Sequence, residues 1–183
     1  MPVPSPITRM YRLEVTLEGC RKRVWRRLEV PGAVSLRLLG LQIQMAMGWD
    51  SPRNGVIHLK GEGLDLEGQA GLRRLRSLGL KPGQGFRFTH DPGQEWEHRV
   101  LVSGIVRPAA GVSYPRLLAG GGTCPSFGVT SPEEYEADRL ADHPEGDPEI
   151  AWAEGTPSSL PGEIELSRID RRLQAIFRAR PYA

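Results

Sequence analysis

The chain has 183 residues, of which 39% are hydrophobic and 25% are charged, and its formal net charge is +2. This length and composition are typical of one globular domain with its own hydrophobic core. No uncharged apolar run approaches the roughly 20 residues of a membrane-spanning helix, so the sequence predicts no transmembrane role. Two cysteines are too few for a secreted disulfide scaffold, and the first residues lack a signal-peptide pattern, so we predict a cytoplasmic protein.

The charges are distributed unevenly along the chain. Residues 1–60 carry ten basic and four acidic side chains, a net charge of +6, whereas residues 108–161 carry two basic and nine acidic side chains, a net charge of −7. A basic stretch can bind phosphates or an acidic partner. The two stretches can equally lie against each other within one fold. The densest basic run is Arg21-Lys22-Arg23, which is followed at once by Arg26 and Arg27. These five side chains are the candidate contact with nucleic acid.

The first elements predicted along the chain are a hairpin and a helix. Three prolines among the first six residues indicate an extended, flexible lead over residues 1–9. Polar and apolar residues alternate over 11–17 and again over 24–30, which predicts two paired strands. Ser35 is suited to cap a helix over 35–47, and the wide apolar stripe of that helix predicts burial.

The middle of the chain is predicted to add more strands. Residues 56–60 are typical of a short strand, and residues 72–78 of a short amphipathic helix that ends at Gly79. Residues 86–88 and 96–102 alternate polar and apolar side chains, which predicts a second hairpin.

The last part of the chain is predicted to be mostly helical. Residues 108–130 contain Gly and Pro clusters without periodicity and predict a long loop. Ser131 is suited to cap an acidic helix that reaches about residue 141. We expect a further helical turn over 149–153, and residues 166–177 carry the apolar stripe of a closing helix.

Strands thus dominate the first part of the chain and helices the remainder. This order is typical of an α+β domain rather than of alternating βαβ units. We predict a single domain over residues 10–178, with an antiparallel sheet of about five strands packed by three to four helices. Residues 179–183 are predicted to form a tail.

Titratable side chains cluster around one predicted hairpin turn. Imidazoles and carboxylates can bind a divalent metal, or act as general acid and base, if the fold brings them into one pocket. In a regular strand Glu95 and Glu97 face away from His98, so the whole set cannot point in one direction. We therefore favour a solvated hairpin tip with a structural His98, and we predict no metal and no cofactor. The cluster consists of His90, Asp91, Glu95, Glu97 and His98.

Other side chains give weaker signals. Cys20 and Cys124 lack the spacing of metal ligands, although Cys124 in its Gly-rich surroundings is a candidate reactive thiol. Trp25, Trp49 and Trp96 lie in or beside periodic segments, which favours core packing over base stacking.

Several strings of the sequence occur together, in order, in one known family. Their letters include W-R-R-x-x-V-P at Trp25–Pro31, I-Q-x-A-M-G-W at Ile43–Trp49, Trp96-Glu97-His98, Tyr114-Pro115, Cys124-Pro125 and Arg171-Arg172-Leu173. With these strings the chain resembles the plasmid open-reading-frame-three-like family over about residues 10–175. The resemblance implies an α+β fold and bacterial proteins, some of them encoded on mobile genetic elements. It implies no established activity.

The chain also departs from the pattern of that family. Where the family carries H-L-H after G-W, this chain has Arg53-Asn54-Gly55, and the family string C-P-P-E-D reads C-P-S-F-G from Cys124 onward. If relatives use those polar residues as a metal or catalytic site, this chain keeps only Asp91, His98 and Cys124 of it. The departures favour a protein that is not an enzyme.

Three functions remain open from the sequence. The first is an accessory or protein-interaction domain that docks a partner or a second copy through its uneven charge. The second is a nucleic-acid-binding module that uses the basic N-terminal half. The third is an enzyme, with or without a metal, built around Asp91, Glu95, Glu97 and His98.

Overall fold

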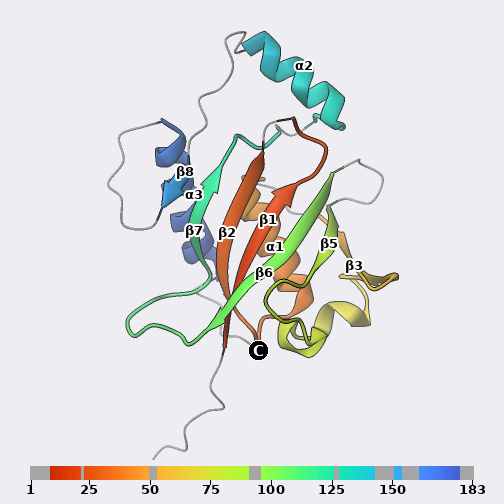
Figure 1. The fold of residues 1–183 in the computed structure, drawn as a ribbon, viewed down its shortest axis with the longest axis vertical. Helices are drawn as coiled ribbons and strands as arrows, with labels where there is room; N and C mark the ends of the chain where they lie inside the picture. Colours follow the sequence, from red (N-terminus) through yellow and green to blue (C-terminus); the bar gives the residue numbers. More distant parts are fainter. Residues whose placement is uncertain are drawn as a thin grey trace, which may run out of the picture.

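The structure is a computed structural model that describes residues 9–21, 23–49, 53–90, 96–125, 128–142, 151–153 and 161–177 (Figure 1). In chain order its elements are β1 (Met10–Leu17), β2 (Val24–Pro31), α1 (Leu36–Met47), β3 (Gly55–Leu59), β4 (Glu62–Asp65), the 3₁₀ helices η1 (Gln69–Leu72) and η2 (Leu75–Leu78), β5 (Gly85–His90), β6 (Glu97–Val106), β7 (Arg116–Gly121), α2 (Pro132–Asp142), β8 (Ala151–Ala153) and α3 (Pro161–Phe177).

The strands of the described residues form one eight-stranded sheet in the order β4-β3-β5-β6-β1-β2-β7-β8. Every pairing between neighbours is antiparallel. The predicted α+β class with an antiparallel sheet is therefore confirmed, although the sheet is wider than the five strands expected. The two predicted hairpins are confirmed as β1–β2 and β5–β6, and the N-terminal hairpin lies in the middle of the sheet.

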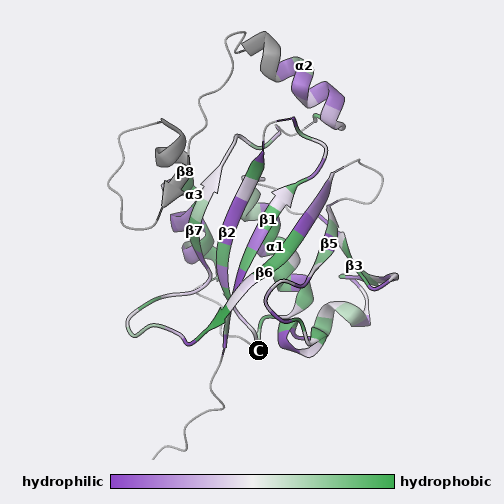
Figure 2. Cartoon of the chain, in the orientation of Figure 1, coloured by the Kyte–Doolittle hydropathy of each residue, from purple (hydrophilic) through white to green (hydrophobic). Residues whose placement is uncertain are grey.

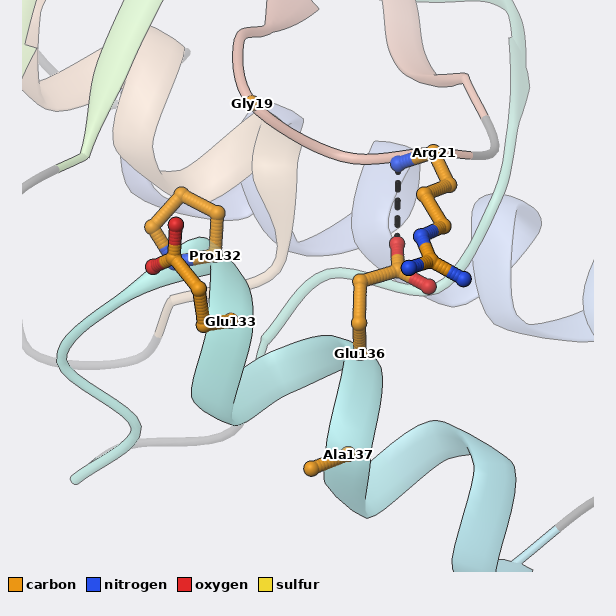
Figure 3. Close-up of a pocket in the computed structure, with 6 residues that line it drawn as sticks. All are labelled: Gly19, Arg21, Pro132, Glu133, Glu136 and Ala137. Carbon is orange, nitrogen blue, oxygen red and sulfur yellow. Dashed lines mark hydrogen bonds between the residues drawn. The ribbon is translucent and has the colours of Figure 1, made fainter.

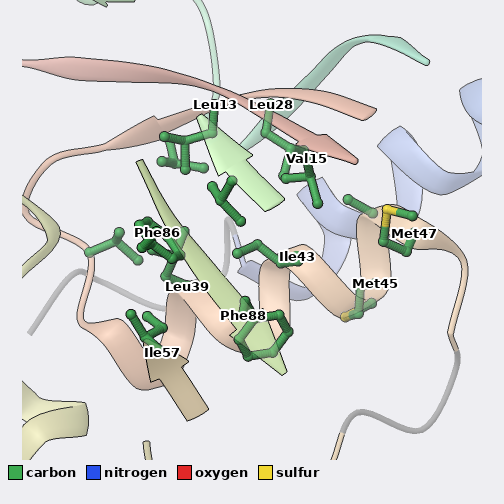
Figure 4. Packing of buried hydrophobic residues seen from close by; sticks show 14 of the residues in the cluster. Leu13, Val15, Leu28, Leu39, Ile43, Met45, Met47, Ile57, Phe86 and Phe88 are labelled. Atoms are coloured by element: carbon green, nitrogen blue, oxygen red, sulfur yellow. The ribbon is translucent and has the colours of Figure 1, made fainter. Parts of the chain in front are cut away.

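The predicted buried helix is confirmed as α1. The hydroxyl of Ser35 accepts a hydrogen bond from the backbone N–H of Leu38 at 3.3 Å, which satisfies one of the free donors at the helix start. The helix ends at Gly48, whose φ of 118° lies in the left-handed region that favours glycine. Leu39 and Ile43 of α1 are fully buried and lie against the sheet in the core (Figure 4).

Two layers result from this packing. In Figure 1, α1 lies behind β1 and β6, and α3 lies behind β7, so both helices cover the same face of the sheet. None of the three α-helices that the structure describes covers the opposite face of the central strands. Hydrophilic and hydrophobic residues both occur along β2 and β6 (Figure 2), and the alternating burial along these strands places exposed or half-buried residues on the opposite face. We call it the open face, and its side chains include Arg12, Glu14, Thr16, Trp25, Arg27, Arg87, Glu97, Arg99 and Leu101.

The helix predicted over 72–78 is replaced by the two 3₁₀ helices η1 and η2. The backbone between them is extended, because Arg73 and Arg74 have φ, ψ values of −61°, 152° and −93°, 145°. The N–H of Leu36 donates to the carbonyl of Arg73 at 2.8 Å, and the N–H of Leu75 donates to that of Val34 at 2.9 Å. These long-range hydrogen bonds hold the segment against the start of α1 and prevent a continuous helix.

Two further predictions are wrong. The predicted loop over 108–130 contains β7, which pairs with β2 and places Arg27 opposite Ala119. The helical turn predicted over 149–153 is instead the strand β8, which pairs with β7 and places Ala153 opposite Ala119. Both strands are short and rich in glycine or alanine, and such residues carry little β-propensity of their own.

The predicted C-terminal helices are confirmed. The hydroxyl of Ser131 accepts a hydrogen bond from the N–H of Glu134 at 3.2 Å, as expected for the cap of α2. α3 begins at Pro161, five residues before the predicted start at residue 166. Among the described residues, no helix combines the length and the apolar character needed to cross a membrane.

Candidate nucleic-acid interface

The described members of the predicted titratable cluster do not all lie on one face of the sheet. His90 and His98 point toward the helices and are 6% and 0% exposed, whereas Glu97 lies on the open face. Asp91 and Glu95 lie outside the described residues. Within the part of the chain that the structure describes, no three His, Cys, Asp or Glu side chains are grouped so as to hold a metal ion.

His98 is a neutral residue of the core. Its Nδ1 lies 3.1 Å from the carbonyl oxygen of Phe88, the geometry of an N–H donating to that acceptor. Trp49 stacks on the ring of His90 at a centroid distance of 4.5 Å and meets His98 edge-on at 5.3 Å. The pKa of His98 is lowered to about 3, mainly because a buried imidazolium would lose its hydration. The hydrogen bond to the carbonyl of Phe88 opposes this shift, and the nearby His90 adds to it. The predicted structural role of His98 agrees with this environment.

Several strings that carry the family resemblance meet around this histidine. The indole N–H of Trp49 donates to the carbonyl of Pro125 at 3.2 Å. A Cβ atom added to Gly48 would lie 3.8 Å from the Cβ of Cys124, which places the two segments in contact. Segments far apart in the sequence therefore share one packed cluster, in which Trp49 is buried as predicted.

Arg26 does not belong to a nucleic-acid interface, which corrects the prediction for this residue. It is 1% exposed. Its Nε donates to the carbonyl of Ala46 at 2.9 Å and its Nη1 donates to that of Gly121 at 2.9 Å. Its Nη1 and Nη2 atoms make further hydrogen bonds to the carbonyls of Trp25, Met47 and Gly122. The guanidinium therefore joins the end of α1 to β7 inside the protein.

Arg21 lies where the hairpin turn meets the acidic helix. Its backbone N–H donates to Oε1 of Glu136 on α2 at 2.9 Å (Figure 3). The two segments line a pocket formed by Gly19, Arg21, Pro132, Glu133, Glu136 and Ala137. At this point the basic and acidic stretches of the chain face each other, one of the alternatives left open by the charge distribution. Lys22 lies outside the described residues.

Arg23 and Arg27 remain on the open face, on either side of Trp25. Their guanidinium carbons lie 4.8 and 5.5 Å from the centroid of the Trp25 ring, within the range of cation–π attraction. Trp25 is half-buried and stands on this face, so its predicted place in the core is wrong. The sequence contained a usable signal, because Trp25 has the opposite strand parity to Val24 and Leu28.

One carboxylate, Glu14, holds both of these arginines. Its Oε1 accepts a hydrogen bond from Arg23, and its Oε2 accepts one from Arg27 at 2.9 Å. Partial burial alone would raise the pKa of Glu14, but the hydrogen bond from Arg27 and the positive charges of both arginines outweigh it and lower the pKa.

Two more arginines of the open face come from later strands. Arg87 on β5 lies 3.3 Å from Glu97, and Arg99 on β6 lies 3.0 Å from Glu18. Their side chains are 67% and 66% exposed, so these ion pairs are weak and screened by salt. The sequence pattern did not single out either arginine, because only the pairing of the strands places them on the same face as Trp25.

A third group of ion-paired residues lies on the open face near the start of β1 and the end of β2. Glu29 is 1% exposed and accepts hydrogen bonds from Arg12 at 2.9 Å and from Arg116 at 2.8 Å. A carboxylate buried between two guanidiniums is structural, because removing either cation would leave the charge poorly compensated. We therefore assign Arg12 and Arg116 to the framework.

The fold and the site define an α+β domain with one face packed by helices and one open face rich in arginine. Its family is that of the plasmid pRiA4b ORF-3-like proteins, whose family model matches residues 9–156, and the chain belongs to this family.

A solved structure shares the fold. A protein of unknown function from Methanosarcina mazei Go1, MM3350, superposes with a TM-score of 0.64 at 23% sequence identity, covering 79% of this chain and 94% of that one. No curated protein matches the chain.

Proposed function

We propose that this protein is a binding module, rather than an enzyme, and that it binds nucleic acid through the open face of its sheet. The observation that carries the proposal is the group formed by Trp25, Arg23 and Arg27, in which an indole on an open sheet face is flanked by two guanidiniums. Bases stack on aromatic rings and on guanidinium planes, and guanidiniums pair with phosphates.

The charge of the open face supports an anionic ligand. Among the described residues, six arginines stand there against five acidic side chains: Arg12, Arg23, Arg27, Arg87, Arg99 and Arg116 against Glu14, Glu18, Glu29, Glu97 and, on the edge strand β4, Asp65. Four of the arginines are at least 41% exposed within pairs that also include partly exposed glutamates. Because such pairs contribute only about 0–1 kcal/mol each, a phosphate can replace the glutamate as the partner.

The proposal is tested by fluorescence anisotropy with labelled single-stranded and duplex DNA and RNA at about 50 and about 200 mM salt. We expect binding that weakens steeply with salt. The double variant Arg23→Gln/Arg27→Gln keeps hydrogen-bonding groups near Glu14 but removes two charges, and it should bind more weakly.

The matched control is Arg73→Gln/Arg76→Gln, which removes the same charge from exposed positions around η2. It should bind nearly as tightly as the parent protein. Absence of binding to every probe at the lower salt concentration would overturn the proposal. The open face would then be a docking surface for a protein or a second copy, and the mass of the protein in solution would be the next measurement.

A further inference from the structure

We propose that the ligand is a single strand of nucleic acid that crosses the sheet nearly perpendicular to its strands, along a row of side chains from Trp25 to His58. This inference rests on the proposed function. It adds the path of the ligand across the sheet, the number of nucleotides that the site contacts, and the expectation that the ligand is single-stranded. The row consists of Trp25, Thr16, Arg99, Arg87 and His58.

The register of the sheet builds this row. Thr16 of β1 lies opposite Trp25 of β2 on one side and opposite Arg99 of β6 on the other. Arg99 in turn lies opposite Arg87 of β5, which lies opposite His58 of β3. Residues directly opposite each other in a sheet point to the same face. Five adjacent strands therefore each contribute one side chain to a single line.

The row faces solvent along its length. The neighbours of these residues along each strand point into the core, where Val15, Val24, Val100, Phe88 and Ile57 are all at most 1% exposed. Arg99, Arg87 and His58 are exposed, and Trp25 and Thr16 are half-buried. A ligand can thus contact the whole row without any rearrangement of the core.

The length of the row suits a short segment of nucleic acid. Neighbouring strands lie about 4.8 Å apart, so four steps span about 19 Å. At about 3.4 Å per stacked nucleotide of one strand, this distance corresponds to roughly six nucleotides. A base can stack on Trp25 at one end, while Arg99 and Arg87 meet phosphates further along.

The same geometry disfavours a duplex. An element that enters the major groove is an α-helix or a two-stranded ribbon, because the groove is only about 12 Å wide, and a row across five strands is too broad. In a duplex the faces of the bases are stacked on one another and unavailable to Trp25. A single strand exposes both its bases and its phosphates.

Two glutamates compete with the ligand along the row. Glu97 pairs with Arg87 and Glu18 pairs with Arg99, and both carboxylates are partly exposed, at 38% and 43%. Neutralising either one releases an arginine for a phosphate. Glu97→Gln should therefore tighten binding by about 1.5- to 5-fold, the range expected for one exposed ion pair, whereas Glu62→Gln at the exposed start of β4 should not.

The first test uses the full chain and labelled homopolymers of roughly two, six and twelve thymidines at low salt, together with a duplex of the same length as the longest probe. We expect affinity to rise between two and six nucleotides and then to level off, with weaker binding to the duplex. Equal affinity for two and six nucleotides, or binding to the duplex as tight as to the single strand, would overturn the inference.

The second test measures separately what Trp25 and Arg87, which lie toward opposite ends of the row, contribute to binding. Arg87→Gln should lower the slope of log K against log salt by about 0.7, the change expected for one lost phosphate contact in a single strand. It should weaken binding of the six-nucleotide probe but not of the two-nucleotide probe. Trp25→Ala should weaken binding of both, by about 5- to 150-fold.

The outcomes distinguish this inference from the proposed function. If Arg23→Gln/Arg27→Gln weakens binding while Arg87→Gln and Glu97→Gln change nothing, the protein binds nucleic acid at Trp25 alone and the row is overturned. If no probe binds, both proposals fail. If the length dependence and the Arg87→Gln slope agree with expectation, the path across the sheet is supported.

Discussion

Arg26 has a structural role in the core, although its basic neighbours in the sequence suggest a role in binding at the surface. It follows the densest basic run closely, yet its parity is that of Val24 and Leu28, and the structure buries it with them. Strand parity predicts that its side chain points into the core and away from a nucleic-acid ligand. No property of the sequence shows which carbonyls accept its hydrogen bonds. Apart from that of Trp25, those carbonyls belong to α1, β7 and the residue after β7, at separations of up to 96 residues.

Replacing this buried cation should strongly destabilise the protein. Arg26→Met fills most of the volume but leaves at least two buried carbonyls without a donor, so we expect the free energy of unfolding to fall by about 3 kcal/mol or more. Urea unfolding measures the change. Arg27→Met, at a position where the arginine is 41% exposed, should lower it by less than about 1 kcal/mol. Equal effects of the two substitutions would contradict this assignment.

The burial of His98 predicts how the stability of the protein depends on pH. Its pKa is about 3 in the folded protein, against 6.5 in a model compound. Between these values the unfolded chain binds a proton that the folded protein does not, so the free energy of unfolding falls as the pH drops below 6.5 and continues to fall toward 3.

The slope is at most about 1.4 kcal/mol per pH unit. His98→Gln removes the titrating group while keeping an N–H that can donate to Phe88. The loss of stability between pH 7 and pH 4, followed by chemical denaturation, should therefore shrink by about 3 kcal/mol in the variant. An unchanged pH dependence would show that His98 is already protonated in the folded state, or that another group governs this range.

Among the elements, hydrophobic periodicity predicts the strands and helices that have one apolar face. The hairpin β1–β2 and the helix α1 have clear two-residue and helical patterns, and both were predictable for that reason. β7 was not, because Gly120 and Gly121 contribute no pattern. The place of β7 in the fold depends on the residues of other elements that pack closely against its glycines, rather than on its own side chains.

Gly120 illustrates that dependence and can be tested. A Cβ atom at this position would lie 2.8 Å from Cδ of Arg26 and 3.1 Å from both Cδ2 of Leu166 and the carbonyl oxygen of Trp25. We expect Gly120→Ala to lower the free energy of unfolding by about 1–3 kcal/mol through overpacking.

The matched control is Gly63→Ala on β4, where the nearest heavy atom, Cγ1 of Val56, would be at an ordinary contact distance of 3.6 Å. It should change stability by less than about 1 kcal/mol. A larger effect at residue 63 than at residue 120, measured by thermal or urea unfolding, would be inconsistent with close packing of β7 on Arg26.

For the whole molecule, the candidate site depends on information that no single segment contains. Trp25 lies close in sequence to Arg23 and Arg27, and the basic character of this stretch was visible there. Arg87 and Arg99 join them only because β6 pairs with β1 and β5 pairs with β6. The uneven charge predicted a basic surface, but its composition follows from the sheet register and could not be derived from strand patterns alone.

The strand order also has a consequence for biosynthesis. The central hairpin is made first, but its partners on either side, β6 and β7, are complete only at residues 106 and 121. Until then the nascent chain carries two unpaired strand edges, which readily associate with other strands. A chain truncated after Val106 would keep the edge of β2 bare and lose the glycine carbonyl of β7 that satisfies Arg26. We therefore expect ribosome-bound intermediates of this protein to stay prone to aggregation until β7 has paired with β2.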